Sequence, residues 1–303
     1  MTKQELTQMV AEILSQMHGQ TQPPVKAADY KTVAYRNDEK PAFRDGDFVP
    51  DVTQLDLRKL YLVEDAAEEE KYRKMKEKTP ARLGSGRAGP RYKTLTMLRF
   101  RADHAAAQDA VFSQVPEDFA EENGLVSVVT RCRDKDEYLT RPDLGRCFDE
   151  HNAKAIKGVI DTPPRVQIVV GDGLSSAAIT ANAMDCLGAI RDGLKLRHID
   201  TGKAIFVKYC RVGAGDAIGD ITGCELVCML VGERPGLVTD KSMSAYITYK
   251  PHVGVSESAR TVVSNIHAQG TPAVEAGAYV AELIDKILKK QVSGVGLHLG
   301  DGA

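Results

Sequence analysis

The sequence predicts an α/β fold: a Rossmann-like three-layer domain with a mostly parallel sheet, preceded by a mainly helical N-terminal region. Two observations lead to this prediction. Between about residues 95 and 295, short apolar runs alternate with longer segments of helical character. The runs Arg165–Val170 and Glu225–Val231 are almost continuously apolar, as expected of strands that are buried on both faces. We therefore expect helices on both sides of the sheet.

The elements of this domain can be assigned in chain order. Strands are expected at Leu125–Thr130, Arg165–Val170, Ala204–Tyr209, Glu225–Val231 and Ser244–Thr248. Helices are expected near 92–113, after Arg141-Pro142-Asp143, over Ser175–Arg191 and over 272–290, with only a short helical turn between residues 209 and 225. The buried face of the last helix is predicted to contain Val274, Ala278, Ala281, Ile284, Ile287 and Leu288.

The N-terminal region has a different character. An amphipathic helix is predicted over residues 2–17, and Thr2 with Glu5 has the spacing of a capping box. The HGQTQPP segment at 18–24 ends it, since glycine and a proline pair cannot continue a helix. Such a tethered helix docks either onto its own protein or onto another molecule. We divide the chain into the helix at 1–20, a linker and helical region at 21–90, which includes a solvated helix over Glu64–Lys78, and the main domain at 91–295.

Composition excludes several classes of function. The net charge of −2 gives no field that would attract nucleic acid, and no run of apolar residues approaches the roughly 20 needed to cross a membrane. Polar residues interrupt the N-terminus where a signal peptide would be apolar, so we expect a cytoplasmic protein. The 6 cysteines form no CxxC pair and are expected to be buried free thiols rather than zinc ligands.

Three loops follow predicted strands, at the edge of the sheet where ligands of α/β proteins bind. The loop 170–176 carries Gly171 and Gly173 and leads into a helix start near Ser175, which could meet a phosphate or could be a simple capped turn. The loop 212–219 is rich in glycine. The loop 232–237 begins with Gly-Glu-Arg-Pro-Gly, typical of a tight turn.

The glycine loop raises the alternative of a nicotinamide-dependent oxidoreductase. Its glycines stand at 213, 215 and 219, so the pattern is one residue longer than the dinucleotide-binding fingerprint. About eight residues separate Gly215 from the next strand, which we judge too short for a helix that crosses the sheet. Asp216 would also place a negative charge beside the pyrophosphate.

Several segments together resemble one family. The chain resembles the small subunit of ethanolamine ammonia-lyase from about residue 84 to residue 290. The segments that carry the resemblance, in order, are Gly86–Arg91, Leu98–His104, Tyr138–Arg146, Asp172–Ser175, Val231–Leu237, Ser264–His267 and Gly270–Pro272.

The resemblance implies a subunit of an ammonia-lyase that is inactive alone. In this family a TIM-barrel large subunit holds ethanolamine and converts it to acetaldehyde and ammonia by radical chemistry, and the small subunit caps adenosylcobalamin. It also implies cofactor contacts at Val212, Glu233 and Val262, the last of which is cysteine in some relatives. A hetero-oligomer with the large subunit is expected, without catalytic residues or a metal site of this chain's own.

Chemical complementarity suggests what individual residues would contact in such a cofactor, which has an apolar ring, a rim of amides, a phosphate and a ribose. Glu233 could accept hydrogen bonds from rim amides, and Val212 could pack on the ring or on the base. Arg211 could bind the phosphate, and Asp172 a ribose hydroxyl or an amide.

The histidine motif that replaces the cofactor's own base on cobalt in other proteins is incomplete here. Asp149-Glu150-His151 begins it correctly, but Lys154 stands where a glycine is required. His151 is therefore expected on a helix surface.

A third hypothesis is a non-enzymatic assembly protein. Merged with the resemblance, it predicts that the N-terminal helix contacts a bacterial microcompartment shell and that the enzyme lies inside the compartment.

Overall fold

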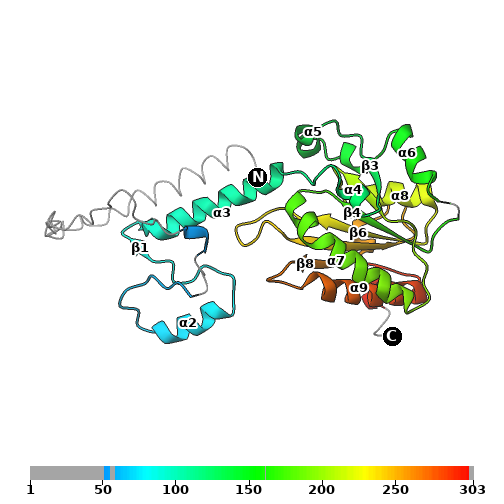
Figure 1. Cartoon of the computed structure of the whole chain (residues 1–303). Coiled ribbons are helices and arrows are strands. Elements are labelled where there is room, and N and C mark those ends of the chain that lie inside the picture. The colour runs from blue at the N-terminus through cyan, green and yellow to red at the C-terminus, as the bar shows by residue number, and fades with distance from the viewer. Residues whose placement is uncertain (1–50, 55–58, 161, 300–303) are drawn as a thin grey trace, which may run out of the picture. The chain divides into compact units, whose positions relative to one another are not determined.

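The computed structural model describes residues 51–54, 59–160 and 162–299, coloured along the chain in Figure 1. Residues from Asp51 onward form one compact unit. The helix predicted over 2–17 lies outside the described residues, and the domain boundaries proposed at 20/21 and 90/91 stay predictions.

The core of the unit is a 6-stranded mixed sheet with the order β3-β5-β4-β6-β7-β8. The β3–β5, β5–β4 and β4–β6 pairings are parallel, whereas β6–β7 and β7–β8 are antiparallel. The α/β class is therefore confirmed, with an antiparallel hairpin added to a parallel sheet. The strands are β3 (Val126–Val129), β4 (Val166–Gly171), β5 (Ile205–Lys208), β6 (Leu226–Gly232), β7 (Met243–Tyr249) and β8 (Arg260–Ile266).

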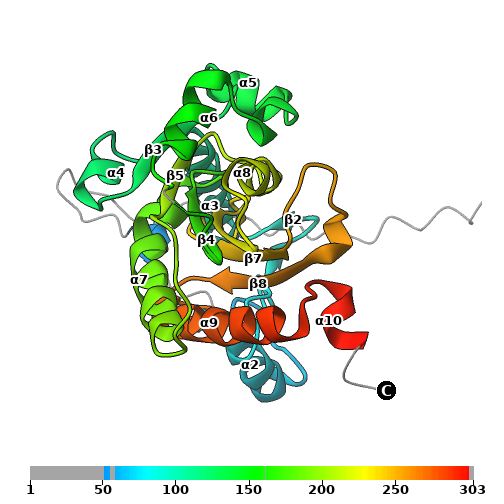
Figure 2. The same cartoon turned by 90° about the vertical axis from the view of Figure 1, so that its right-hand side faces the viewer.

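Helices cover both faces of the sheet (Figure 2). On one face α7 (Ser176–Lys195) and α9 (Ala273–Lys290) enclose a core that includes Ile168 and Leu230. On the other face α6 (Glu150–Lys157) and α8 (Ala214–Thr222) enclose a second core around Val169 and Met229. The other helices are α2 (Glu69–Glu77), α3 (Thr94–Phe112), α4 (Phe119–Glu122), α5 (Lys135–Thr140) and α10 (Val295–Leu299), with short 3₁₀ turns η1 (Val52–Gln54), η2 (Leu144–Arg146) and η3 (Glu257–Ala259) and a small hairpin of β1 (Arg87–Ala88) and β2 (Arg91–Tyr92).

The two helices of the first core approach each other closely because glycines stand at their crossing. A Cβ atom on Gly193 of α7 would lie 2.6 Å from the Ala281 side chain, and one on Gly277 of α9 would lie 2.6 Å from both the Ala189 side chain and the Cys186 carbonyl oxygen. The N-terminus of α7 is fixed by Ser175, whose hydroxyl accepts a hydrogen bond from the Ala178 N–H at 3.1 Å.

Two helix predictions were wrong in their bounds. The helix expected after Arg141-Pro142-Asp143 begins only at Glu150, because η2 and an extended Cys147 intervene and Asp149 is the N-cap. The helix expected over Glu64–Lys78 begins only at Glu69, although its ion pairs Glu69–Arg73 and Glu70–Lys74 are confirmed at 2.6 and 2.7 Å.

The segment between β5 and β6 also differs from the prediction. It was expected to contain only a short turn, too short for a helix that crosses the sheet, but it forms the 9-residue α8. This helix connects β5 to β6, which are not neighbours in the sheet. The helix begins at Ala214, inside the glycine run, so residues that were counted as part of a loop belong to the helix. Strand β8 was not predicted. On α9, Val274 and Ala278 are exposed, and Ala276, Gly277 and Val280 take part in the buried face instead.

Candidate functional site

The three loops predicted to form a ligand site do lie together at one edge of the sheet. Backbone hydrogen bonds join them: the Cys210 N–H donates to the Asp172 carbonyl at 2.8 Å, and the Leu174 N–H donates to the Gly232 carbonyl at 3.0 Å. The loop after β4 therefore bridges the loops after β5 and β6. Strand β8 also ends at this edge, because Met243 of β7 pairs both with Gly232 and with Ile266.

Glycines allow these loops to pack so closely. A Cβ atom on Gly232 would lie 2.0 Å from the carbonyl oxygen of Ser175, and one on Gly173 would lie 2.5 Å from the carbonyl oxygen of Gly232. Both obstacles are backbone atoms, which cannot move aside as a flexible side chain could. The two glycines are needed for the loop spacing itself.

Glu233 lies half-buried immediately after β6, and its carboxylate is held by one side chain. Its Oε1 accepts a hydrogen bond from the Tyr246 hydroxyl at 2.5 Å, while its N–H donates to the Ser242 carbonyl at 2.9 Å. Burial raises the pKa of Tyr246, and the neighbouring Glu233 raises it further, so the phenol stays protonated and donates. Among the described residues, Oε2 of Glu233 has no partner and is available to accept from a ligand.

Val262 lies next to this pair. It stands opposite Tyr246 in the β7–β8 register, and the residue is 46% exposed. Alternate residues of β7 point to opposite faces: Ala245 and Ile247 enter the α7/α9 core, whereas Tyr246 packs against the α6/α8 core. Tyr246 and Val262 therefore belong to the α8 side of the sheet, where β8 leaves apolar surface exposed.

Arg211 and Val212 follow β5, at the start of the turn into α8. The Arg211 guanidinium lies 4.2 Å from the centre of the Tyr138 ring, and its Nη2 donates to the Tyr138 carbonyl at 2.7 Å. Val212 is half-buried, and its carbonyl accepts from the Gly215 N–H at 3.1 Å. The position of Val212 is thus fixed by the first turn of α8.

Asp172 differs from the other predicted contacts because it is only 2% exposed. Its Oδ1 accepts a hydrogen bond from the Ser176 hydroxyl at 2.6 Å. Burial raises the pKa of this carboxyl, and the Ser176 hydrogen bond and Lys135 offset part of that effect. The nearby Ser175 hydroxyl donates to the Asp240 carbonyl, so the start of α7 is already occupied by the protein's own groups.

Three buried side-chain atoms in the described part of the chain lack a hydrogen-bond partner: Gln167 Oε1, Arg211 Nε and Ser244 Oγ. Two of them belong to the candidate site, since Arg211 follows β5 and Ser244 pairs with Val231 near the end of β6. Buried polar groups in proteins are normally satisfied. Unmet hydrogen-bonding capacity at this edge fits a site that is completed by a polar ligand.

Sequence reasoning missed Tyr246 and the ion pair of Asp216 with Arg260. Tyr246 had a usable signal: polar Ser244, Tyr246 and Thr248 alternate with apolar neighbours along β7, the pattern of a strand with one polar face. Asp216 had been considered only as an obstacle to pyrophosphate. Its partner is far away in the sequence and lies on the strand that was not predicted.

The glycine loop serves packing. Gly215 and Gly219 lie within α8, where added Cβ atoms would meet Met229 and Pro251 respectively. This arrangement is unlike a loop that is open to a pyrophosphate, so the nicotinamide alternative is not favoured.

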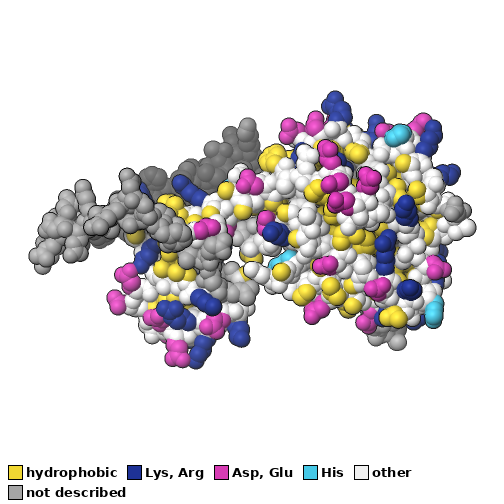
Figure 3. Space-filling model, in the orientation of Figure 1, with side chains coloured by type: hydrophobic (Ala, Val, Ile, Leu, Met, Phe, Trp, Pro, Cys, Tyr) yellow, Lys and Arg dark blue, Asp and Glu magenta, His cyan; other side chains and the backbone are white. Residues whose placement is uncertain are grey.

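Other classes of site find no support in the described residues. No group of three His, Cys, Asp or Glu residues there could hold a metal ion, and all 6 cysteines are free. His151 is exposed on α6, as predicted. On the face drawn in Figure 3, acidic and basic side chains are interspersed. Within the same part of the chain, no helix combines the length and the apolar character needed to cross a membrane.

Comparison with known proteins gives a consistent result. The family described as "Ethanolamine ammonia-lyase light chain (EutC)" matches residues 69–298. A protein of Clostridium perfringens is 54% identical over 297 residues, which is 98% of this chain and 100% of the relative. A protein of Listeria innocua is 56% identical over 298 residues, with the same coverage of 98% and 100%. Both relatives are described as ethanolamine ammonia-lyase small subunits.

Proposed function

Because the chain belongs to the ethanolamine ammonia-lyase small-subunit family, we propose that it caps adenosylcobalamin against a TIM-barrel large subunit. The complex is a lyase that converts ethanolamine to acetaldehyde and ammonia. Bound adenosylcobalamin supplies the radical chemistry, through its cobalt–carbon bond. The residues of this chain bind and orient the cofactor and exclude water from one side of it.

The observation that carries the proposal is the arrangement of Glu233, Tyr246 and Val262 beside the Arg211–Val212 loop. It offers an acceptor with one free oxygen and a guanidinium at the edge where the strand ends meet, and an exposed apolar surface farther along β8. A corrin has rim amides that donate to carboxylates, an apolar face, and a phosphate on its nucleotide tail. The buried, unpartnered Arg211 Nε supports the fit with an anionic group.

Each proposed contact then has a distinct role. Glu233 accepts from a rim amide through Oε2, and Val212 with Val262 provides apolar contact. Arg211 binds the phosphate through a guanidinium oriented by the Tyr138 ring and carbonyl. Asp172 is buried within its loop, so a ribose hydroxyl or an amide that binds its Oδ1 must replace the Ser176 hydroxyl.

The test is co-expression with the large subunit. The purified complex should deaminate ethanolamine only when adenosylcobalamin is added, and this chain alone should be inactive. Glu233→Gln should weaken cofactor binding by about tenfold, the effect expected for a hydrogen bond to a charged group. Glu282→Gln, at an exposed position on α9, is the matched control. Deaminase activity of this chain alone, or binding unchanged in Glu233→Gln, would contradict the proposal.

A second part of the proposal concerns residues 1–20. Their amphipathic pattern is typical of a docking helix. We propose that this helix directs the enzyme into a bacterial microcompartment. Deletion of residues 1–20 should leave the activity of the complex intact and disperse it through the cell. An unchanged distribution under fluorescence microscopy would refute this role.

A further inference from the structure

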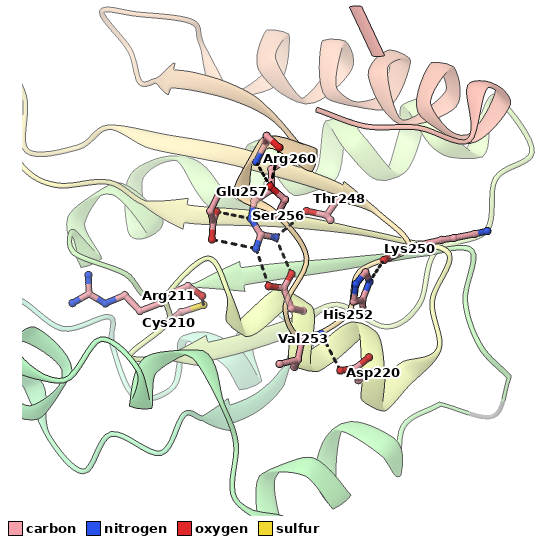
Figure 4. A network of polar contacts seen from close by, with 12 residues as sticks. Cys210, Arg211, Asp220, Thr248, Lys250, His252, Val253, Ser256, Glu257 and Arg260 are labelled. Carbon is pink, nitrogen blue, oxygen red and sulfur yellow. Dashed lines mark hydrogen bonds and ion pairs between the residues drawn. The ribbon is translucent and has the colours of Figure 1, made fainter. Parts of the chain in front are cut away.

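A buried ion pair joins α8 to β8. Asp216 stands in the first turn of α8, and Arg260 is the first residue of β8. Arg260 Nη1 lies 2.8 Å from Asp216 Oδ1, and Nη2 lies 2.7 Å from Oδ2, so the contact is bidentate. The two side chains are 3% and 9% exposed. Figure 4 shows Arg260 and the contacts that surround it.

The remaining donors of Arg260 are also engaged. Its Nε donates to Glu257 Oε2 at 2.7 Å, and Nη1 donates to Thr248 Oγ1 at 3.2 Å. Thr248 belongs to β7 and Glu257 to η3, so the guanidinium connects α8 with both strands of the hairpin and with the turn between them (Figure 4). A planar fork used in this way fixes orientation as well as distance.

The two partners of the pair lie on the same segments as two of the proposed cofactor contacts. On the α8 side, backbone hydrogen bonds from Gly215 to Val212 and from Asp216 to Gly213 tie the Val212 loop to the helix turn that carries Asp216. On the sheet side, Val262 follows Arg260 by two residues and therefore shares its face of β8. The ion pair thus connects the segment that carries Val212 to the strand that carries Val262.

A separate contact holds the other end of α8. The Val253 N–H donates to Asp220 Oδ2 at 3.0 Å (Figure 4). In addition, Gly219 packs against Pro251. Loss of the Asp216–Arg260 pair would leave this second attachment in place. The helix would stay docked while its first turn, and Val212 with it, gained freedom to move.

We propose that Asp216 and Arg260 are positioning residues that set the spacing between Val212 and Val262 and thereby the affinity for the corrinoid. This inference rests on the proposed function. A buried ion pair usually adds little net stability, because desolvation offsets attraction, and apolar replacement of both partners is often neutral or stabilising. The role that the geometry supports is therefore orientation of the two segments.

The test compares corrinoid affinity with stability in the purified two-subunit complex. The double variant Asp216→Leu/Arg260→Met removes both charges at similar volume, and Arg260→Lys keeps the charge but cannot form the fork. Hydroxocobalamin binding is measured by equilibrium dialysis, and unfolding by urea titration. We expect both variants to bind about tenfold more weakly or worse, because small misplacements of contact groups have effects of this size. The urea midpoint should stay near that of the parent, and the rate at saturating adenosylcobalamin should fall much less than the affinity.

Arg165→Lys is the matched control. Arg165 forms a more exposed pair with Glu225 at 3.1 Å. Both residues directly precede their strands, β4 and β6, and so lie at the end of the sheet opposite to the candidate site. Replacement of Arg165 should change neither the corrinoid affinity nor the urea midpoint. Parental affinity in the double variant would overturn the inference. If the double variant does not fold, Arg260→Lys decides in the same way. A parent complex that binds no corrinoid would refute the proposed function itself, whereas binding in the parent and equally in the variants would refute only the positioning role.

Discussion

The phenolic oxygen of Tyr246 lies 2.5 Å from Oε1 of Glu233 and donates a hydrogen bond to it. Tyr246 lies on β7, and Glu233 directly follows the neighbouring antiparallel strand β6, 13 positions earlier in the chain. Because one carboxylate oxygen is held in this way, the direction of the other is fixed before any ligand arrives. Tyr246 is thus expected to prepare Glu233 for binding.

Tyr246→Phe removes only the hydroxyl that holds Glu233. We expect the affinity of the two-subunit complex for hydroxocobalamin to fall by about fivefold, corresponding to about 1 kcal/mol for one hydrogen bond. The unfolding midpoint should change little, since the ring keeps its packing. Tyr279→Phe on α9, where the tyrosine is exposed, is the control and should bind as the parent does. Equal affinities in the two variants would show that Tyr246 does not prepare Glu233.

Gly232→Ala tests the close packing of the loops. The added methyl group would lie 2.0 Å from the Ser175 carbonyl oxygen, so the backbone must shift. We expect the free energy of unfolding to fall by about 1–3 kcal/mol or more, as in other overpacked sites. Gly236→Ala is the control, because nothing lies within 4 Å of its added methyl group. Urea titration measures both, and equal stability of the two variants would contradict the packing described for the site.

Asp172→Asn tests the cost of a buried carboxylate. Burial raises the pKa of Asp172, so its contribution to stability is present at low pH and is lost as the pH rises through the raised value. At pH 7 the neutral amide should therefore increase the free energy of unfolding, and the gain should shrink as the pH falls towards about 4.

Asp143→Asn provides a control of opposite sign. Its hydrogen bond with Arg141 lowers the pKa of Asp143, so the ionised form contributes stability at neutral pH that is lost on acidification. This variant should show no gain at pH 7. Urea titrations at several pH values give the comparison, and a loss of stability at pH 7 in Asp172→Asn would contradict the burial argument.

Thiol reactivity should distinguish one cysteine from the other five. Burial raises the pKa of Cys186 to about 12, and it also raises the pKa of Cys132, Cys210, Cys224 and Cys228. Only the thiolate reacts rapidly, and these side chains are also inaccessible. Cys147 is the single cysteine that is not fully buried. Iodoacetamide at pH 8 should therefore label Cys147 first in the folded chain and all 6 cysteines in urea, as read by mass spectrometry.

Much of the sheet could be predicted, because strands buried on both faces leave continuous apolar runs. Strand β8 lacks this signal: Val262, Ser264 and Asn265 are exposed, so hydrophobicity does not mark it. The face of α9 was assigned from spacing alone. The choice between Val274 and Val280 depends on where α7 crosses, and the crossing is set by Gly193 and Gly277, which do not appear in a count of apolar residues.

The candidate site could be predicted only in part. Glycine loops after strands marked the edge where ligand groups gather, and the structure brings Arg211, Val212 and Glu233 to that edge. The resemblance to a family was needed to single out Val262. Tyr246 was marked only by the alternating polar residues of β7. Arg260 pairs with a residue 44 positions away and lies on a strand that was not predicted, so no local pattern indicates its role. Asp172 could be placed in its loop, but its burial depends on Ser176 and the packing of the loops around it.

The ion pair between α8 and β8 also has a consequence for biosynthesis. Asp216 leaves the ribosome 44 residues before Arg260, an interval of about 2–9 s at roughly 5–20 residues per second. During that time the nascent chain holds a carboxylate whose burial is costly without its counterion, so the docking of the first turn of α8 against the sheet is disfavoured. The proposed corrinoid-binding surface is therefore completed only after β8, which carries Val262 and Arg260, has been translated. A chain truncated before residue 260 would carry Arg211, Val212 and Glu233 without the rest of that surface.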